Sequence, residues 1–146
     1  MLQSYHARND LQVTINTQVS CVGASPLVVG IGVIVAGCSN GSFRIYSQSL
    51  KEEKLVSGHS SSILGISWAA DGSEFLTASL DGCVKLWSRS GAARRTVAQS
   101  PDPVLGVCWS PDGNSVAYIT GNRLCTISMI EGSELDAAWA ISGGFD

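Results

Sequence analysis

Histidine, aspartate and serine, the residue types of a hydrolytic triad, all occur in this 146-residue chain. His59 and Asp81, with one of the many serines, could supply the base, the carboxylate that orients it and the nucleophile. Only two imidazoles are present, His6 and His59, so the choice of base is narrow. The repeat described below explains His59 without catalysis. The sequence therefore predicts a protein with no catalytic residue, no bound metal and no cofactor.

The cysteines are a second potential source of chemistry, and there are five of them: Cys21, Cys38, Cys83, Cys108 and Cys125. No C-x-x-C pair occurs, which disfavours a zinc knuckle or a thioredoxin-type redox site. Three of them lie among apolar, strand-like residues, and we expect buried free thiols. Their odd number favours a reducing compartment, because an oxidising one would leave at least one thiol unpaired.

The charge balance disfavours general nucleic-acid binding. Nine basic and twelve acidic residues give a formal charge of −3, whereas nucleic-acid binding draws most of its affinity from a strong positive field. One stretch, with Lys85, Arg89, Arg94 and Arg95, contains no acidic residue. Two interpretations of it stay open: a solvated strand-and-turn surface, or a basic patch for an acidic partner or a nucleic acid.

Neither a secretory signal nor a membrane span is expected. The first 18 residues lack the apolar core of a signal peptide. The longest apolar run, residues 26–38, is too short to cross a bilayer, and we interpret it as a buried strand and its approach. We expect a cytoplasmic protein without membrane insertion.

A 41-residue repeat organises the chain. Residues 63–78 (ILGISWAADGSEFLTA) align with residues 104–119 (VLGVCWSPDGNSVAYI) at a constant offset. At the same offset, residues 40–46 (NGSFRIY) precede residues 81–87 (DGCVKLW). A period near 41 with several short strands per unit is typical of β-propeller blades.

The middle unit predicts four antiparallel strands. Apolar residues at 63–68 and 75–79 form two strands around a hairpin turn at Asp71-Gly72, where glycine accepts a positive φ. A second turn at Asp81-Gly82 leads to a third strand that ends at Trp87, and residues 95–98 form an outer strand. We therefore expect an all-β fold of about three four-stranded propeller blades.

This unit resembles a WD40 repeat. Gly58-His59 stands where that family has its Gly-His pair, Asp81 occupies the turn between the second and third strands, and Trp87 ends the third strand, followed by Ser88 in place of the family's aspartate. The resemblance implies a hydrogen-bonded tetrad of His59, Thr77, Asp81 and Trp87. In it Asp81 accepts from the imidazole, His59 accepts from Thr77, and Thr77 accepts from Trp87, so that each buried polar group has a partner.

The flanking units depart from this pattern. In the first, Ala36, Asn40 and Tyr46 replace the hydroxyl, the aspartate and the tryptophan. In the third, no histidine precedes Val104, and Ile127 stands where tryptophan is expected. We expect these two blades to depend on apolar packing alone.

A closer resemblance concerns residues 35–130. The segments 40–45, 81–91 and 96–129 resemble the N-terminal propeller of the intraflagellar transport proteins. That resemblance implies a structural subunit of intraflagellar transport complex B, with other subunits of the complex as partners. It also implies a place in the cilium or flagellum and at its base.

The favoured function is a non-catalytic scaffold for protein–protein interaction, because binding residues concentrate on loops held by a rigid frame. A WD40 adaptor of another cytoplasmic complex and a nucleic-acid-binding module are the alternatives. Trp68 and Trp109 are expected in the blade cores. The candidate contact residues lie in turns: Asp71, Gly72, Arg89, Asp102, Pro103, Asp112 and Asn114.

The repeat divides the chain into an N-terminal segment or strand of a preceding blade (1–20), a degenerate blade (21–57), a WD40-like blade (58–98), a second degenerate blade (99–140) and a tail (141–146). Closed propellers have at least four blades. We expect the chain to be a fragment, a truncated product or part of an oligomer, with further blades of this or another chain closing the ring.

Overall fold

The computed structural model describes residues 10–26 and 32–130, and within these ranges the chain forms eleven β-strands and no helix. No described segment is therefore a helix that could cross a membrane. The all-β prediction is confirmed. The strands are β1 (Val19–Ala24), β2 (Val33–Cys38), β3 (Ser42–Ser47), β4 (Glu52–Ser57), β5 (Ile63–Trp68), β6 (Glu74–Ser79), β7 (Cys83–Ser88), β8 (Ala93–Gln99), β9 (Val104–Trp109), β10 (Ser115–Thr120) and β11 (Arg123–Ser128).

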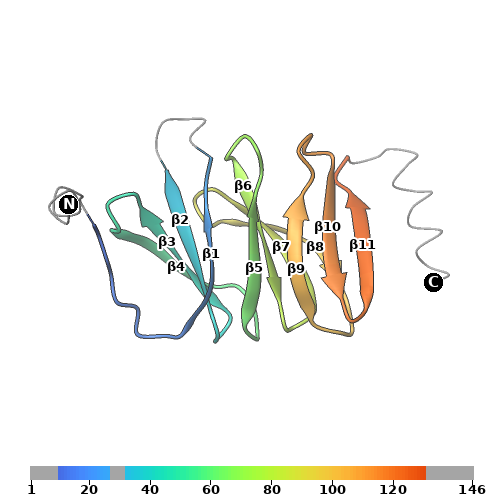
Figure 1. Cartoon of the computed structure of the whole chain (residues 1–146), viewed down its shortest axis with the longest axis horizontal. Helices are drawn as coiled ribbons and strands as arrows, with labels where there is room; N and C mark the ends of the chain where they lie inside the picture. The colour runs from blue at the N-terminus through green and yellow to red at the C-terminus, as the bar shows by residue number, and fades with distance from the viewer. Residues whose placement is uncertain (1–9, 27–31, 131–146) are drawn as a thin grey trace, which may run out of the picture.

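The strands make three antiparallel sheets that follow one another along the chain, as successive blades of an open propeller (Figure 1). We call them blade 1 (β1–β4), blade 2 (β5–β8) and blade 3, in which β9–β11 are described. The first strands β1, β5 and β9 lie side by side and connect the blades. The prediction of about three propeller blades is confirmed.

Hairpin turns alternate between two ends of this row. Turns that follow the first and third strand of a blade lie at one end, uppermost in Figure 1, and we call it the upper end. The turns between second and third strands, together with the links from blade to blade, lie at the lower end. At that end the link after blade 2 crosses the β6–β7 turn, where Ser100 N–H donates to the Gly82 carbonyl at 2.7 Å. Gly82 has φ +88°, and a Cβ there would collide with the Ser100 carbonyl oxygen.

The hydrophobic cores lie between the blades. Between blades 1 and 2, Phe43 meets Phe75 and Trp87 edge-on, with ring centroids 5.4 Å and 4.8 Å apart. Between blades 2 and 3, Leu76 and Val84 pack with Val104 and other apolar residues of blade 3. Each buried face thus depends on the neighbouring blade, because a sheet with one apolar face needs a second layer to cover it.

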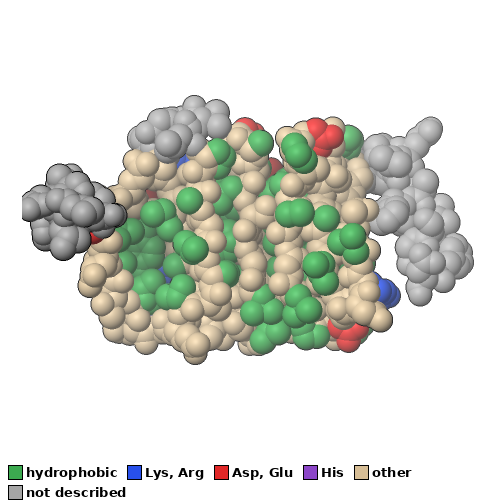
Figure 2. Space-filling view, viewed as in Figure 1, with side chains coloured by type: hydrophobic (Ala, Val, Ile, Leu, Met, Phe, Trp, Pro, Cys, Tyr) green, Lys and Arg blue, Asp and Glu red, His purple; other side chains and the backbone are tan. Residues whose placement is uncertain are grey.

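One face of blade 3 has no such cover among the described residues. Ile119 pairs with Leu124, and Ala117 with Cys108 and Thr126, so these side chains share a face. Ile119 is 45% exposed and Leu124 is 74% exposed. Their repeat equivalents in blade 2 are Ala78 and Val84, both fully buried. Figure 2 shows hydrophobic side chains at the surface over the third sheet.

This arrangement corrects the prediction of buried thiols. All five cysteines are free, but only Cys38 is buried, and Cys108 is exposed because it lies on the uncovered face of blade 3. Cys21, Cys83 and Cys125 are half-buried. The sequence pattern marked them as strand residues but carried no information on which neighbouring blade covers them.

Parts of several predictions lie outside the described residues. They are His6 and the rest of residues 1–9, residues 27–31 of the apolar run, residues 131–140 of the third blade and the tail 141–146. The proposed boundaries of the blades stay predictions. Within the described part of the apolar run, β2 is buried along nearly its whole length.

Candidate functional site

The four residues proposed as a tetrad lie together in blade 2. The imidazole of His59, in the link before β5, lies 2.9 Å from Asp81 Oδ2 through Nδ1 and 2.6 Å from Thr77 Oγ1 through Nε2. Trp87, near the end of β7, donates its indole N–H to the same Thr77 oxygen at 2.8 Å. Thr77 is fully buried, and both His59 and Trp87 are nearly so. These bonds join the link, two strands and a turn.

The direction of the protons follows from chemistry. The indole N–H is a donor only, so Thr77 Oγ1 accepts from Trp87 and its own hydrogen points to His59 Nε2. The imidazole must then have its proton on Nδ1, which donates to the Asp81 carboxylate. Burial lowers the pKa of His59, although the neighbouring Asp81 carboxylate opposes this. His59 is therefore neutral at pH 7, in agreement with the hydrogen-bond direction.

Asp81 organises the lower end of blade 2. Its Oδ1 accepts from Cys83 N–H at 2.9 Å and its Oδ2 accepts from Ser60 N–H at 3.1 Å, besides the bond to His59. Burial opposes ionisation of the carboxyl group, but these donors outweigh burial and lower the pKa of Asp81. The carboxylate thus fixes the β6–β7 turn and the entry to β5 at once.

This geometry leaves His59 without a free nitrogen, because both ring nitrogens are used inside the blade. One pentapeptide that sequence reasoning overlooked, Gly37 to Gly41, has the G-x-S-x-G spacing of a hydrolase nucleophile turn. It forms the β2–β3 hairpin turn, whereas the hydrolase element joins a strand to a helix. The structure thus brings no described base to Ser39. Among the described residues, no three His, Cys, Asp or Glu side chains are grouped so as to hold a metal ion.

Polar bonds also stabilise the degenerate blades, so the expectation of apolar packing alone is wrong. In blade 1, Asn40 Oδ1 accepts from Ser42 N–H at 3.0 Å, which does part of the work of Asp81. In blade 3, Thr120 Oγ1 donates to the Asp102 carbonyl at 3.3 Å. Ser79, 41 residues earlier, makes the same bond to the Ser61 carbonyl at 3.0 Å. Comparison of hydroxyl positions between the repeats could have found this pair.

The candidate contact turns fall at two opposite ends and form no single surface. Asp71, Gly72 and Arg89 meet at the upper end, where Arg89 Nη1 donates to the Gly72 carbonyl at 3.1 Å. Asp112 and Asn114 lie in the next upper turn, with Asn114 N–H donating to Asp112 Oδ1 at 2.9 Å. The other two candidates, Asp102 and Pro103, lie at the lower end, in the link between β8 and β9.

Two upper-end carboxylates accept hydrogen bonds within their own turns. Asp71 Oδ1 accepts from the Ser73 hydroxyl at 2.7 Å and Asp112 Oδ1 accepts from the Ser110 hydroxyl at 2.5 Å. These bonds lower the pKa of both carboxyl groups, so both are ionised at neutral pH. The upper end therefore presents fixed negative charge at two successive turns.

The basic stretch does not form one patch of unengaged cations. Lys85 Nζ donates to the Gly58 carbonyl at 2.6 Å, and the guanidinium of Arg89 lies over the Trp68 ring, 5.9 Å from its centroid. Arg94 pairs with Glu74 at 3.3 Å, and Arg95 contacts Met129. These intramolecular contacts favour the interpretation of a strand-and-turn surface over nucleic-acid binding.

Comparisons with known proteins agree with this geometry. The family model described as WD domain, G-beta repeat matches residues 50–88, which include all four tetrad residues. The β-propeller domain of Cps50 (Swd1) from Myceliophteria thermophila superposes with a TM-score of 0.71 at 21% identity, over 81% of this chain and 38% of that one. The structure of U3-55K superposes with a TM-score of 0.73 at 17% identity, over 83% of this chain and 39% of that one.

These two likenesses establish the fold alone, and the chain spans about two fifths of the length of each structure. No curated protein matches the sequence. Together with the repeat match, the superpositions identify blade 2 as a WD40 repeat within consecutive β-propeller blades.

Proposed function

We propose that this chain, with its WD40 repeat in a row of propeller blades, is a non-catalytic scaffold for protein–protein interaction. The observation that carries the proposal is the complete internal use of His59: its two nitrogens bond Asp81 and Thr77. The chemistry-bearing residues of blade 2 hold the frame, and the turns at its ends remain for recognition. Rigid frames that display turns in this way are typical of binding proteins.

Partner binding by turn variants tests the scaffold. Asn114→Arg changes an exposed turn residue at the upper end, and Pro103→Arg is its matched control at the lower end. A partner that docks on one end loses binding at least tenfold with one variant and keeps it with the other. If both variants bind every isolated partner as the wild type does, recognition by these turns is wrong.

The uncovered face of blade 3 supports a second element of the proposal, that further blades complete the ring. Leu76 and Leu86 of blade 2 are buried against blade 3, while Ala117 and Thr126, their repeat equivalents, have no described neighbour. Continuity with the two established interfaces argues for another four-stranded blade on this face, from the same chain or another. We infer that such a blade buries Ile119 and Leu124.

We further propose that the scaffold is a subunit of intraflagellar transport complex B. The support is the resemblance of segments 40–45, 81–91 and 96–129 to the N-terminal propeller of intraflagellar transport protein 80. In that role the partners are other subunits of the complex. The protein then acts in ciliary or flagellar assembly and is found in the cytoplasm, in the cilium and at its base.

Expression of the epitope-tagged chain in ciliated cells tests this assignment. The tagged chain is expected to purify with complex B subunits and to enter the cilium, whereas the same tag on an unrelated propeller is not. A chain that binds other cytoplasmic proteins and is absent from cilia contradicts the transport assignment and supports a general WD40 adaptor instead.

A further inference from the structure

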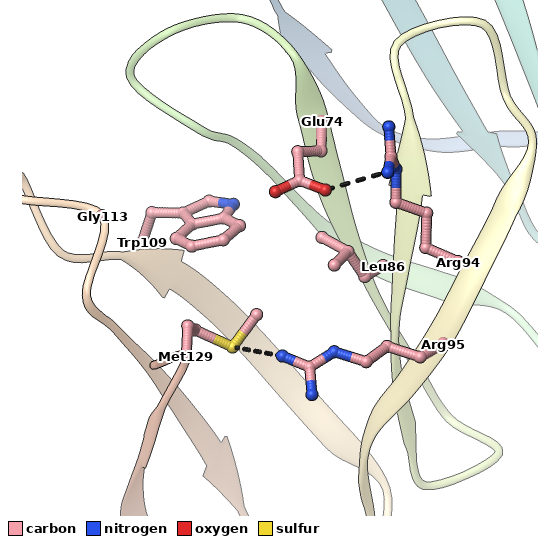
Figure 3. A pocket seen from close by; sticks show the side chains of 7 residues that line it. All are labelled: Glu74, Leu86, Arg94, Arg95, Trp109, Gly113 and Met129. Carbon is pink, nitrogen blue, oxygen red and sulfur yellow. Dashed lines mark hydrogen bonds and ion pairs between the residues drawn. The ribbon is translucent and has the colours of Figure 1, made fainter. Parts of the chain in front are cut away.

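The junction of blades 2 and 3 contains an open groove at the upper end. One cavity of about 370 Å³ is lined by Glu74, Leu86, Arg94, Arg95, Trp109 and Met129 with Gly113 (Figure 3). A neighbouring depression of about 280 Å³ shares Glu74, Trp109 and Gly113 and extends to Asp71 and Asp112. The larger cavity is within the size range of ligand sites, about 300–1,000 Å³.

The equivalent junction of blades 1 and 2 is filled, and it shows what the groove lacks. There Trp68, 41 residues before Trp109, donates its indole N–H to the carbonyl of Gly23 at 3.2 Å. Arg89 covers its ring. A Cβ on Gly72 would meet the Arg89 guanidinium at 3.3 Å, whereas a Cβ on the equivalent Gly113 would meet nothing within 4 Å.

Trp109 is the residue left incomplete by this difference. Its Nε1 is buried and has no acceptor in the described part of the chain. A buried donor without an acceptor costs about 1–3 kcal/mol, so a ligand that supplies one gains binding energy there. At the filled junction the acceptor is a backbone carbonyl, and the geometry therefore points to the carbonyl of an extended peptide segment.

Charge selects the side chain of that segment. Arg94 and Arg95 lie on β8 at the outer part of the groove, opposite Trp109 in Figure 3, and only Glu74 carries negative charge in the larger cavity. The Glu74–Arg94 pair leaves one net positive charge. Each guanidinium has five N–H donors, so Arg95 can bind a carboxylate and keep its contact with the Met129 sulfur. Met129 is flexible enough to adapt to a bound chain.

We propose that this groove binds an extended peptide of a partner protein, with a backbone carbonyl on Trp109 Nε1 and an acidic side chain on Arg95. The proposal rests on the scaffold function and names the chemistry of one partner. It requires a small rotation of Glu74, Met129 or the indole, because Nε1 lies below the groove surface. The inner part of the groove, with Asp71 and Asp112, excludes a second acidic residue at that end.

The test uses the full chain and two fluorescein-labelled libraries of eight-residue peptides, random except for a central glutamate in one and a central glutamine in the other. The glutamate library is expected to bind at least tenfold more tightly. In ¹⁵N-tryptophan-labelled protein it is expected to shift the indole resonance of Trp109, assigned with Trp109→Phe, and to leave that of Trp68 unchanged. Trp109→Phe is expected to weaken binding about fivefold, the loss of one neutral hydrogen bond.

Matched variants separate the groove from other surfaces. Arg95→Gln is expected to weaken binding tenfold, and Arg123→Gln, an exposed arginine at the lower end, to leave it unchanged. Equal binding of the two libraries, or a shift of Trp68 in place of Trp109, overturns the proposal. If a partner binds wild type and Trp109→Phe equally, the groove is refuted and the scaffold stands. Peptide binding without any protein partner refutes the scaffold alone.

Discussion

Trp87 donates its indole N–H to the hydroxyl oxygen of Thr77 at 2.8 Å, and this bond sets the direction of every proton in the network of blade 2. Because the indole cannot accept, Thr77 must donate to His59, and His59 must donate to Asp81. Removing the last acceptor therefore leaves a defined set of donors without partners.

Asp81→Ala is expected to lower the free energy of unfolding by about 1–3 kcal/mol, because it leaves the imidazole N–H and the backbone N–H groups of Ser60 and Cys83 without their acceptor. Chemical denaturation measures the loss. Asp112→Ala removes an exposed turn aspartate and is the control, with an expected change within about 0.5 kcal/mol. Equal losses for the two variants contradict a special role for Asp81.

Acid is expected to destabilise the chain in two steps. The pKa of His59 is lowered by burial, so below about pH 6.5 the unfolded chain binds a proton that the folded chain does not, and stability falls as the pH falls. The slope is at most about 1.4 kcal/mol per pH unit for this one proton. The pKa of Asp81 is also lowered, so its contribution is complete above about pH 4 and is lost as the pH falls further.

Unfolding curves between pH 7.5 and pH 5 measure the first step. His59→Gln removes the titrating group, and its stability is expected to change less over this range even though its value at pH 7.5 is lower. The same slope in both proteins places the titration elsewhere.

Gly82→Ala and Gly113→Ala separate backbone strain from steric collision. Both glycines have positive φ, +88° and +76°, so each alanine is strained by about 1–2 kcal/mol. A Cβ on Gly82 additionally meets the Ser100 carbonyl, whereas one on Gly113 has open space. Thermal unfolding is expected to show a clearly larger loss for Gly82→Ala. A similar loss in both variants indicates that the link after blade 2 moves away at little cost.

Local pattern and repeat predicted the strands and turns of this fold because each depends on its own residues. Asp71-Gly72 and Asp81-Gly82 form the expected hairpin turns, and Gly82 has the positive φ that such a turn requires. The sequence could not predict which contacts cross between blades. Trp68 and Trp109 have the same repeat position, and both were expected in a core, yet both lie half-buried at blade junctions. Only one of them finds an acceptor, because Gly23 is near Trp68 and no equivalent carbonyl reaches Trp109.

The same reasoning accounts for Lys85. Its place on a strand suggested a solvated or basic surface, but its ammonium group crosses to the carbonyl of Gly58 at 2.6 Å. That bond depends on the approach of the link before β5 to β7, which no local spacing encodes. Residues that act across blades or between sheet and link thus needed the three-dimensional structure.

Leu124→Lys tests the uncovered face of blade 3. Leu124 is 74% exposed, so a lysine there removes little packing, and the melting temperature is expected to change by less than about 2 °C. The lysine places a charge on the face that pairs Ile119 with Leu124, and burial of that charge against another blade is unfavourable. Sedimentation at increasing concentration is expected to show weaker self-association than in the wild type. Leu11→Lys is the matched control, because Leu11 is 59% exposed and precedes β1. If both variants associate as the wild type does, the face of Leu124 is not the surface on which a further blade packs.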